Sequence, residues 1–150
     1  QVAAETGAAI AVMHSRGTPQ TMGSLTDYGD VVSEVASYLL GRAERLERLG
    51  VGGDAVVLDP GFGFAKDARQ SLLLLRRLAD LAALGYPLLV GTSRKSFIGG
   101  TLDVGLEERL EGTLATISWA VAQGARVIRG HDVQAIVRTV RMTEAILRSR

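Results

Sequence analysis

The sequence contains the stretch Val90-Gly91-Thr92-Ser93-Arg94-Lys95-Ser96, in which a short buried strand ends in polar and cationic side chains. The end of a strand has no structural need for two adjacent cations, whereas a site for an anionic or electron-rich ligand does. Two further apolar runs end in side chains that could bind a ligand, at Asp59–Phe64 and at Arg129–Asp132. This repetition indicates an α/β protein whose ligand binds where the strands end.

Short apolar runs alternate with longer helical patterns along the whole chain. Continuous apolar runs are typical of parallel strands covered on both faces, and they predict strands over Ala9–Met13, Ala55–Leu58, Leu88–Val90 and Arg126–Ile128. Apolar residues spaced at about 3.6 predict helices over Asp30–Leu49, Asp67–Leu84, Leu106–Gln123 and Val133–Arg148. The residues Gln1–Glu5 read as the tail of another helix.

This strand-helix order, repeated four times, predicts a parallel sheet with right-handed crossovers. Each unit takes about 40 residues, somewhat more than the ~30 of a unit in an eight-unit barrel. Two architectures stay open: a small open α/β sheet, and the second half of a closed barrel whose first half is absent. A start inside a helix, without an initiator methionine, favours the fragment.

The composition limits the class of protein. The 150 residues are enough for one domain, and 47% of them are apolar. Acidic and basic residues are interspersed, with a formal net charge of +1, which argues against a nucleic-acid partner. The lack of cysteine excludes disulfides and thiolate metal sites and fits the cytoplasm. With no signal peptide and no run of about 20 apolar residues, we expect no membrane partner.

Asp59 follows a predicted strand and precedes a loop rich in glycine and phenylalanine. Its carboxylate is suited to accept two N–H bonds from a flat heterocycle, or else it caps the loop. Gly61 and Gly63 would let a ligand approach the backbone closely. Of Phe62 and Phe64, we expect one to pack under the loop and the other to be free to stack on a ring.

Two cations, Arg94 and Lys95, follow the third predicted strand. They suit an anion or a ring carbonyl, although an adjacent Arg-Lys pair is more often a solvated surface feature. Ser93 and Ser96 are candidates to cap the next helix. The N-terminus of that helix would add backbone N–H donors to an anion site.

Arg129 and His131 lie two residues apart and would point to the same side of a continuing strand. The guanidinium fork suits phosphate, and an imidazole donates a second bond. The alternative is that His131 is a structural histidine at the end of the strand. Asp132 is expected to cap the final helix or to orient His131.

Three further side chains receive mainly structural interpretations. His14 is expected to be structural rather than a metal ligand. Met13 faces a ligand if its strand points inward at that position, and otherwise belongs to the core. Trp119 lies in a helical apolar stripe and is expected to face the core.

Together these segments resemble the dihydropteroate synthases. The matching motifs occur in that family's order and are Met13–Met22, Leu58–Lys66, Leu89–Gly99, Glu107–Thr113 and Ile128–Val133. The Ser-Arg-Lys and Arg-x-His-Asp pieces distinguish this family from related pterin-binding methyltransferases. The resemblance implies that residues 1–150 are the C-terminal half, (βα)4, of a TIM (β/α)8 barrel that binds a pterin.

The resemblance also implies a transferase of folate biosynthesis and a sulfonamide target. Such an enzyme condenses 6-hydroxymethyl-7,8-dihydropterin diphosphate with p-aminobenzoate and releases 7,8-dihydropteroate and diphosphate. An alternative is a half-barrel that binds pterin or phosphate without turnover; a third interpretation is a structural α/β domain. A complete member would be a cytoplasmic homodimer that uses Mg²⁺.

Site residues are implied position by position. Asp59 and Lys95 would bond the pterin ring. The remaining substrate contacts would come from Met13, Gly63, Phe64, Gly91, Ser96, Arg129 and His131. Of these, Ser96 would hold the aminobenzoate carboxylate, and Arg129 and His131 would hold the diphosphate. Lys95, Arg129 and His131 would be the catalytic residues, and no general base is needed if C–O cleavage runs ahead of attack.

The sequence departs from the family in two ways. Gly130 stands where the family usually has valine, which is expected to loosen the geometry of Arg129 and His131. The first four strands, with a metal-binding asparagine and two substrate loops, are not in this sequence, so we expect no metal ligand within it.

Overall fold

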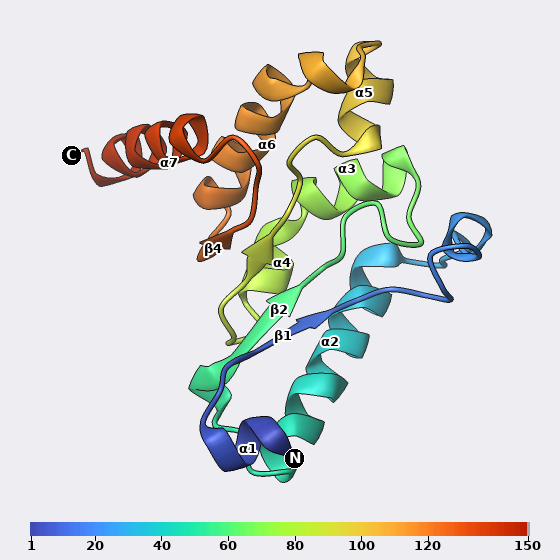
Figure 1. Ribbon diagram of the computed structural model, residues 1–150, viewed down its shortest axis with the longest axis vertical. Helices are drawn as coiled ribbons and strands as arrows, with labels where there is room; N and C mark the ends of the chain where they lie inside the picture. Colours follow the sequence, from blue (N-terminus) through green and yellow to red (C-terminus); the bar gives the residue numbers. More distant parts are fainter. Residues whose placement is uncertain (150) are drawn as a thin grey trace.

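The computed structural model describes residues 1–149, which form an α/β fold (Figure 1). Its α-helices are α1 (Val2–Thr6), α2 (Val31–Arg48), α3 (Ala68–Arg76), α4 (Leu78–Ala82), α5 (Ser96–Leu102), α6 (Leu110–Ala122) and α7 (Val133–Arg148). Its strands are β1 (Ile10–Met13), β2 (Val56–Asp59), β3 (Leu89–Val90) and β4 (Val127–Ile128). Short 3-10 turns occupy Met22–Ser24, Gly53–Ala55 and Leu106–Glu108. All four predicted strands are confirmed, with ends shifted by at most one residue.

The four strands are parallel and follow one another in chain order. β1 pairs with β2 from Ile10 opposite Val56, and β3 pairs with β4 from Leu89 opposite Val127. A single parallel bridge between Leu58 and Leu88 joins the two pairs. The carboxyl ends of all four strands therefore lie along one edge, where the sequence places its polar loops.

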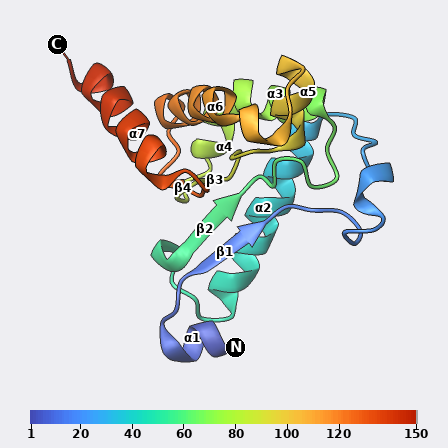
Figure 2. The ribbon, with the colours of Figure 1, turned by 45° about the horizontal axis from the view of Figure 1, so that its top comes forward.

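The two outer strands each have an open side. Within residues 1–149, β1 pairs with β2 alone and β4 with β3 alone. Ala11 of β1 is exposed, and 39% of Val127 in β4 is exposed. The N-terminal α1 and the C-terminal α7 lie at opposite ends of the molecule in both views (Figures 1 and 2). The strand row thus ends, on both sides, in unpaired backbone.

Helix α2 packs along β1 and β2 and follows the predicted pattern (Figure 2). The Asp30 carboxylate accepts hydrogen bonds from the backbone N–H groups of Val32 and Ser33, which begins the helix. Its inner face is a buried apolar stripe made of Val31, Val35, Leu39 and Ala43. The stripe joins Val56, Leu58, Leu74, Leu78, Leu88 and Val90 in one hydrophobic core.

The single helix predicted over Asp67–Leu84 is divided in the structure. A capping box between Asp67 and Gln70 begins α3, but Arg77 leaves helical geometry and α4 restarts after it. Leu78 and Leu81 are fully buried after the break. Because leucine favours a helix on both sides of Arg77, tertiary packing rather than local propensity sets this division.

A second difference is α5, a short helix that the periodicity did not predict. Gly99 and Gly100 lie inside it and weaken the local helical signal. A Cβ atom at Gly99 would lie only 2.6 Å from Nε of Arg109. The glycine is therefore needed for contact with a guanidinium that comes from later in the chain.

The prediction that Trp119 faces the core is wrong. Its side chain is 48% exposed, and its Nε1–H donates to the carbonyl oxygen of Leu75 at 2.8 Å. Ile117 and Ala120 occupy the buried face of α6 instead. The indole thus lies over the end of α3 with its polar atom paired.

No helix within residues 1–149 has the length and apolar character needed to cross a membrane.

Candidate functional site

Side chains from the ends of β2, β3 and β4 converge at one edge of the sheet. Nη2 of Arg129 lies 3.6 Å from Oδ2 of Asp59, although these residues are 70 positions apart. Nζ of Lys95 lies 4.2 Å from the centroid of the Phe64 ring. The fold therefore brings together a carboxylate, two cations and an aromatic ring that the sequence singled out separately.

Asp59 is buried, and its two oxygens have different environments. Oδ1 accepts a hydrogen bond from the backbone N–H of Gly61 at 2.8 Å, which is the expected loop cap. Oδ2 faces Arg129. Burial raises the pKa of this carboxyl, while the Gly61 bond, Arg129 and Lys95 act in the opposite direction. One side chain thus caps its loop and also faces the guanidinium of Arg129.

The two phenylalanines of the loop divide as expected. Phe62 is fully buried and packs in the core, whereas Phe64 is half-buried beneath Lys95. Gly61 has a φ of +68°, and a Cβ atom there would lie 2.0 Å from the carbonyl oxygen of His14. The glycine is therefore required for a close approach to the backbone of His14.

Lys95 is a partly buried residue rather than a solvated surface charge. Burial lowers the pKa of its ammonium group, and the nearby Arg129 lowers it further, while Asp59 raises it. Two cations held near each other make the site locally positive, which suits an anion.

A hollow of about 260 Å³ opens beside these cations. Its lining consists of Gly91, Ser93, Lys95, Arg129, Gly130 and His131. The Arg129 guanidinium lies over Gly91, where an added Cβ atom would approach Nη2 to 3.1 Å. Two cations and an imidazole around one hollow make a geometry suited to a multiply charged anion.

Two neighbours of the hollow behave differently from the prediction. Arg94 does not face the hollow as a free cation, because its guanidinium forms a two-point ion pair with Asp132 at 2.8 and 3.1 Å. Asp132 precedes α7 but makes no side-chain cap there. Ser93, rather than Asp132, is the residue that contacts the imidazole of His131, at 2.9 Å from Nδ1. Both corrections follow from contacts between loops 38 residues apart.

Ser96 and Met13 lie at the margins of the site. Ser96 is the first residue of α5 and is exposed, while the preceding Lys95 occupies the N-cap position without a side-chain cap bond. Met13 ends β1 and packs near Gly61, where an added Cβ atom would lie 3.3 Å from its Cγ. Neither lines the 260 Å³ hollow.

Gly130 is enclosed by its neighbours. A Cβ atom there would lie 2.3 Å from Cδ1 of Ile136 and 3.3 Å from Cβ of Ser93. Ile136 of α7 therefore fills the space that a branched residue at position 130 would take.

Sequence reasoning missed Lys66, which is almost fully buried. Its ammonium contacts Nδ1 of His14 at 2.9 Å and donates to the carbonyl oxygens of Phe64 at 2.9 Å and Gly61 at 3.1 Å. Burial lowers the pKa of Lys66 to about 7. The position of Lys66 directly after a glycine-rich loop was the one sequence feature that pointed to a special role. The partners of its ammonium group depend on how that loop turns, which the sequence does not show.

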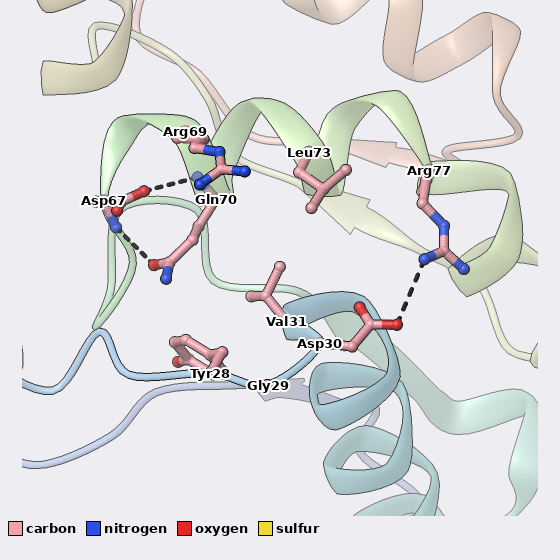
Figure 3. A pocket seen from close by; sticks show the side chains of 9 residues that line it. All are labelled: Tyr28, Gly29, Asp30, Val31, Asp67, Arg69, Gln70, Leu73 and Arg77. Carbon is pink, nitrogen blue, oxygen red and sulfur yellow. Dashed lines mark hydrogen bonds and ion pairs between the residues drawn. The ribbon is translucent and has the colours of Figure 1, made fainter.

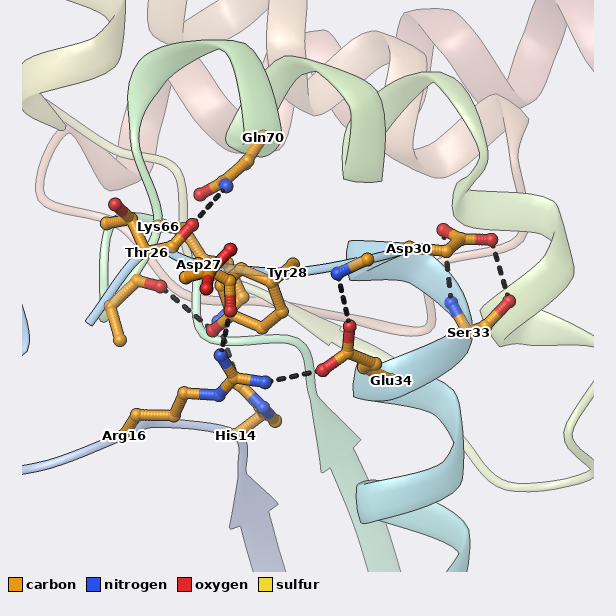
Figure 4. A network of polar contacts seen from close by, with 12 residues as sticks. His14, Arg16, Thr26, Asp27, Tyr28, Asp30, Ser33, Glu34, Lys66 and Gln70 are labelled. Atoms are coloured by element: carbon orange, nitrogen blue, oxygen red, sulfur yellow. Dashed lines mark hydrogen bonds and ion pairs between the residues drawn. The ribbon is translucent and has the colours of Figure 1, made fainter.

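His14 is structural, as expected, and belongs to a wider polar network (Figure 4). Burial, followed by the charges of Lys66 and Arg16, lowers the pKa of His14 to about 4. Arg16 donates to the carbonyl oxygen of Asp27 and to the carboxylate of Glu34. The network ties the long loop after β1 to the N-terminus of α2.

A second hollow, of about 360 Å³, lies between the N-terminus of α2 and α3 (Figure 3). Arg77 reaches Asp30 at 3.5 Å across it, and Gln70 completes the capping box with Asp67 at one end. Its polar groups are thus occupied by helix caps and an ion pair, and it lies apart from the residues at the strand ends.

The described residues do not by themselves fit a magnesium ion. Within residues 1–149, no three histidine, aspartate or glutamate side chains are grouped as a metal site would require. The buried carboxylate of Asp59 already faces Arg129 and caps a loop. A resident metal would need ligands from outside this group.

Comparisons with known proteins agree with this geometry. Residues 1–131 match the family described as pterin binding enzyme. A dihydropteroate synthase from Synechocystis is 47% identical over 148 residues, covering 98% of this chain and 51% of that protein. A Mycobacterium tuberculosis relative, named inactive dihydropteroate synthase 2, is 42% identical over 151 residues and is covered for 48% of its length. The chain thus spans about half the length of the relatives it matches.

Solved structures give the same result. A Yersinia pestis dihydropteroate synthase with a sulfonamide drug complex has a TM-score of 0.94 at 36% identity, with 99% of this chain and 54% of that one covered. The Thermus thermophilus enzyme in complex with 4-aminobenzoate has a TM-score of 0.92 at 43% identity, with 97% and 60% covered. The chain belongs to the family of pterin-binding enzymes that includes the dihydropteroate synthases.

Proposed function

We propose that residues 1–150 form the C-terminal half of a (β/α)8 barrel, the pterin-binding domain of a dihydropteroate synthase. The observation that supports this most strongly is the convergence of Asp59, Lys95 and Arg129 from the ends of three successive parallel strands. Active sites of such barrels lie at the carboxyl ends of their strands. An N-terminal half would pair with the open sides of β1 and β4.

In the whole barrel, Asp59 and Lys95 form hydrogen bonds to the pterin ring, and Met13, Gly63 and Gly91 line the pterin pocket. Phe64 lies between the pterin and the aminobenzoate, and Ser96 holds the aminobenzoate carboxylate. The hollow beside Arg129 and His131 takes the diphosphate. The substrate is 6-hydroxymethyl-7,8-dihydropterin diphosphate, and the nitrogen of p-aminobenzoate attacks it.

The charges of the site suit departure of diphosphate. As the C–O bond breaks, negative charge grows on the leaving group beside Arg129 and His131, and fixed donors stabilise it without reorganisation. Positive charge grows on the pterin near the buried carboxylate of Asp59. The arylamine is already nucleophilic, so no side chain of this chain is required as a base.

Mg²⁺ is proposed to assist this step from ligands in the N-terminal half, where it would neutralise charge on the diphosphate. The complete protein is proposed to be a homodimer in the cytoplasm. Exposed apolar residues on α7, including Met142 and Ile146, are available to a partner surface.

A second candidate function is binding of pterin or phosphate without turnover. It is favoured by the 42% identity to a relative named inactive dihydropteroate synthase 2. Both candidate functions place the anion in the hollow beside Arg129 and His131, and they differ in whether 7,8-dihydropteroate is formed.

The test joins residues 1–150 to the N-terminal half of the Synechocystis relative, by fusion or co-expression, and we call this protein the completed barrel. Formation of 7,8-dihydropteroate is followed by mass spectrometry, and pterin binding by calorimetry. Turnover that Lys95→Ala reduces by at least about 10²-fold, with folding intact, supports the synthase. Tight pterin binding with no product supports the binding module, and absence of both overturns both candidates.

A further inference from the structure

The loops after β3 and β4 are joined by two separate contacts. Oγ of Ser93 lies 2.9 Å from Nδ1 of His131 and accepts the backbone N–H of His131 at 3.1 Å. Nη2 and Nε of Arg94 contact the two carboxylate oxygens of Asp132 at 2.8 and 3.1 Å. We call these four residues the loop clamp. It connects the segment that carries Lys95 to the segment that carries Arg129.

The first contact favours one tautomer of His131. The Ser93 oxygen accepts one backbone N–H, and its hydroxyl has one proton to donate. Among residues 1–149, Nδ1 of His131 is the acceptor that this hydroxyl contacts. If Nδ1 accepts, the ring proton of neutral His131 is on Nε2, where it is free to donate to an anion in the hollow.

The second contact holds an unfavourable backbone conformation. Arg94 has a φ of +57°, in the left-handed region that L-residues with side chains seldom adopt. Besides the ion pair with Asp132, the backbone of Arg94 makes two hydrogen bonds. The Arg94 N–H donates to Oγ1 of Thr113 at 3.1 Å, and the Arg94 carbonyl oxygen accepts from Nη1 of Arg109 at 3.0 Å. These three partners fix the turn immediately before Lys95 and thereby set the direction in which its side chain leaves the strand.

We propose that Ser93, Arg94 and Asp132 are positioning residues for the anion site. Ser93 orients His131 so that its Nε2–H donates into the hollow, and the Arg94–Asp132 pair fixes Lys95 relative to Arg129. This inference rests on the proposed function, because it takes the anion to be the diphosphate. It explains why the chain carries two adjacent cations of which only Lys95 faces the site.

The first test reads the tautomer directly in the completed barrel. Two-bond nitrogen-proton NMR distinguishes a protonated ring nitrogen from a bare one, and His131 is assigned from the loss of its signals in His131→Gln. We expect a bare Nδ1 and a protonated Nε2 at a pH where the ring is neutral. A proton on Nδ1 of neutral His131 would overturn the inference, whatever the fate of any variant.

The second test measures the affinity for diphosphate by calorimetry. Ser93→Ala is expected to weaken diphosphate binding by about tenfold, the scale of one hydrogen bond near an ion, and to leave pterin affinity within about twofold. The matched control is Ser118→Ala, which removes a similar 2.8 Å contact to Thr143 between α6 and α7, away from the hollow. It should change neither affinity.

Arg94→Gly and Arg94→Ala separate the ion pair from the backbone. Both remove the guanidinium, but glycine adopts a φ of +57° without strain, so Arg94→Gly should retain more diphosphate affinity than Arg94→Ala. Arg77→Ala removes an exposed ion pair elsewhere and serves as the control. Equal affinities of Arg94→Gly, Arg94→Ala and wild type would overturn the role of Arg94.

The outcomes separate this inference from the proposed function. If wild-type completed barrel binds no diphosphate, the proposed function and the inference both fail. If wild type binds diphosphate and Ser93→Ala binds it equally well, the inference alone fails. If Ser93→Ala does not fold, the NMR measurement on wild type decides.

Discussion

At Asp59, one carboxylate uses its two oxygens for different purposes, and this makes a sharp prediction. Asp59→Asn can still accept the N–H of Gly61, but an amide N–H would then face Arg129 or the ligand. We expect pterin affinity to fall by at least about tenfold, because a buried donor is left unpaired. Calorimetry with a pterin, on the completed barrel, measures it.

The stability of the same variant provides the control. Burial raises the pKa of Asp59 in the folded chain above its ordinary value of 3.8. This shift stabilises the fold below pH 3.8, and the stabilisation is lost as the pH rises through the raised pKa. Asparagine is neutral throughout, so Asp59→Asn should keep or increase the Tm at pH 7. A lower Tm with intact pterin affinity would show that Asp59 only caps its loop.

His14 predicts a pH dependence of stability. Its pKa is about 4 in the folded chain against 6.5 ordinarily, so the unfolded chain binds the proton first as pH falls. Stability is expected to decrease between about pH 6.5 and 4, by up to about 3 kcal/mol. Lys66 adds little slope over most of this range, because well below its pKa of about 7 it is protonated in both the folded and the unfolded chain.

Urea unfolding of wild type and His14→Gln across this pH range checks the assignment. Glutamine accepts a bond from Lys66 but does not titrate. The variant should therefore show a flatter dependence of unfolding free energy on pH. Identical slopes for the two proteins would mean that another group causes the loss.

Among single residues, the sequence predicted which side chains converge at the strand ends better than it predicted their partners. Asp59, Lys95 and Arg129 follow strands, and parallel strands bring such residues together whatever the loops do. The partners of Arg94 and Lys66 lie 38 and 52 residues away. Nothing local distinguishes a cation that faces the hollow from one that binds an aspartate, so the sequence alone predicts neither the ion pair of Arg94 nor the buried contacts of Lys66.

At the scale of elements, the loop between β2 and α3 depends on Lys66. In Lys66→Met, the carbonyl oxygens of Gly61 and Phe64 and Nδ1 of His14 lose their donor inside the protein. We expect a loss of about 1–3 kcal/mol of stability, the cost of unsatisfied buried acceptors less the relief of a buried charge. Residues 61–66 should also exchange amide hydrogens faster.

Denaturant unfolding and hydrogen exchange measure these two effects. Arg69→Met is the control, because Arg69 is exposed at the start of the adjacent α3. It should alter neither quantity. A Lys66→Met protein with wild-type exchange in the loop would show that the turn is held by its glycines alone.

Elements were predictable where the apolar period was continuous and capped. α2 has both a capping aspartate and a regular stripe, and its predicted bounds are nearly those observed. The break at Arg77 and the short α5 were not predictable, because each depends on packing from elsewhere. At α5, the guanidinium of Arg109 requires a glycine that weakens the helical signal.

At the scale of the whole molecule, strand order and direction followed from the alternation of strands and helices. Four successive units in half a barrel leave the first and last strands each with an open side, and within residues 1–149 β1 and β4 have such sides. The periodicity left an open sheet and half a closed barrel equally possible. The resemblance, and then the similarity to known synthases, favours the barrel.

The open edges predict how residues 1–150 behave alone. Unpaired parallel edges and a partly exposed inner face, with Val127 39% exposed, are templates for association. We expect dimers or larger aggregates in light scattering, conversion to a defined species when an N-terminal half is supplied, and no turnover by the isolated chain. Val127→Lys should reduce association more than Leu102→Lys, which adds the same charge at an exposed leucine of α5, away from both outer strands and from α7. A well-folded monomer, or synthase activity from the 150 residues alone, would contradict the half-barrel.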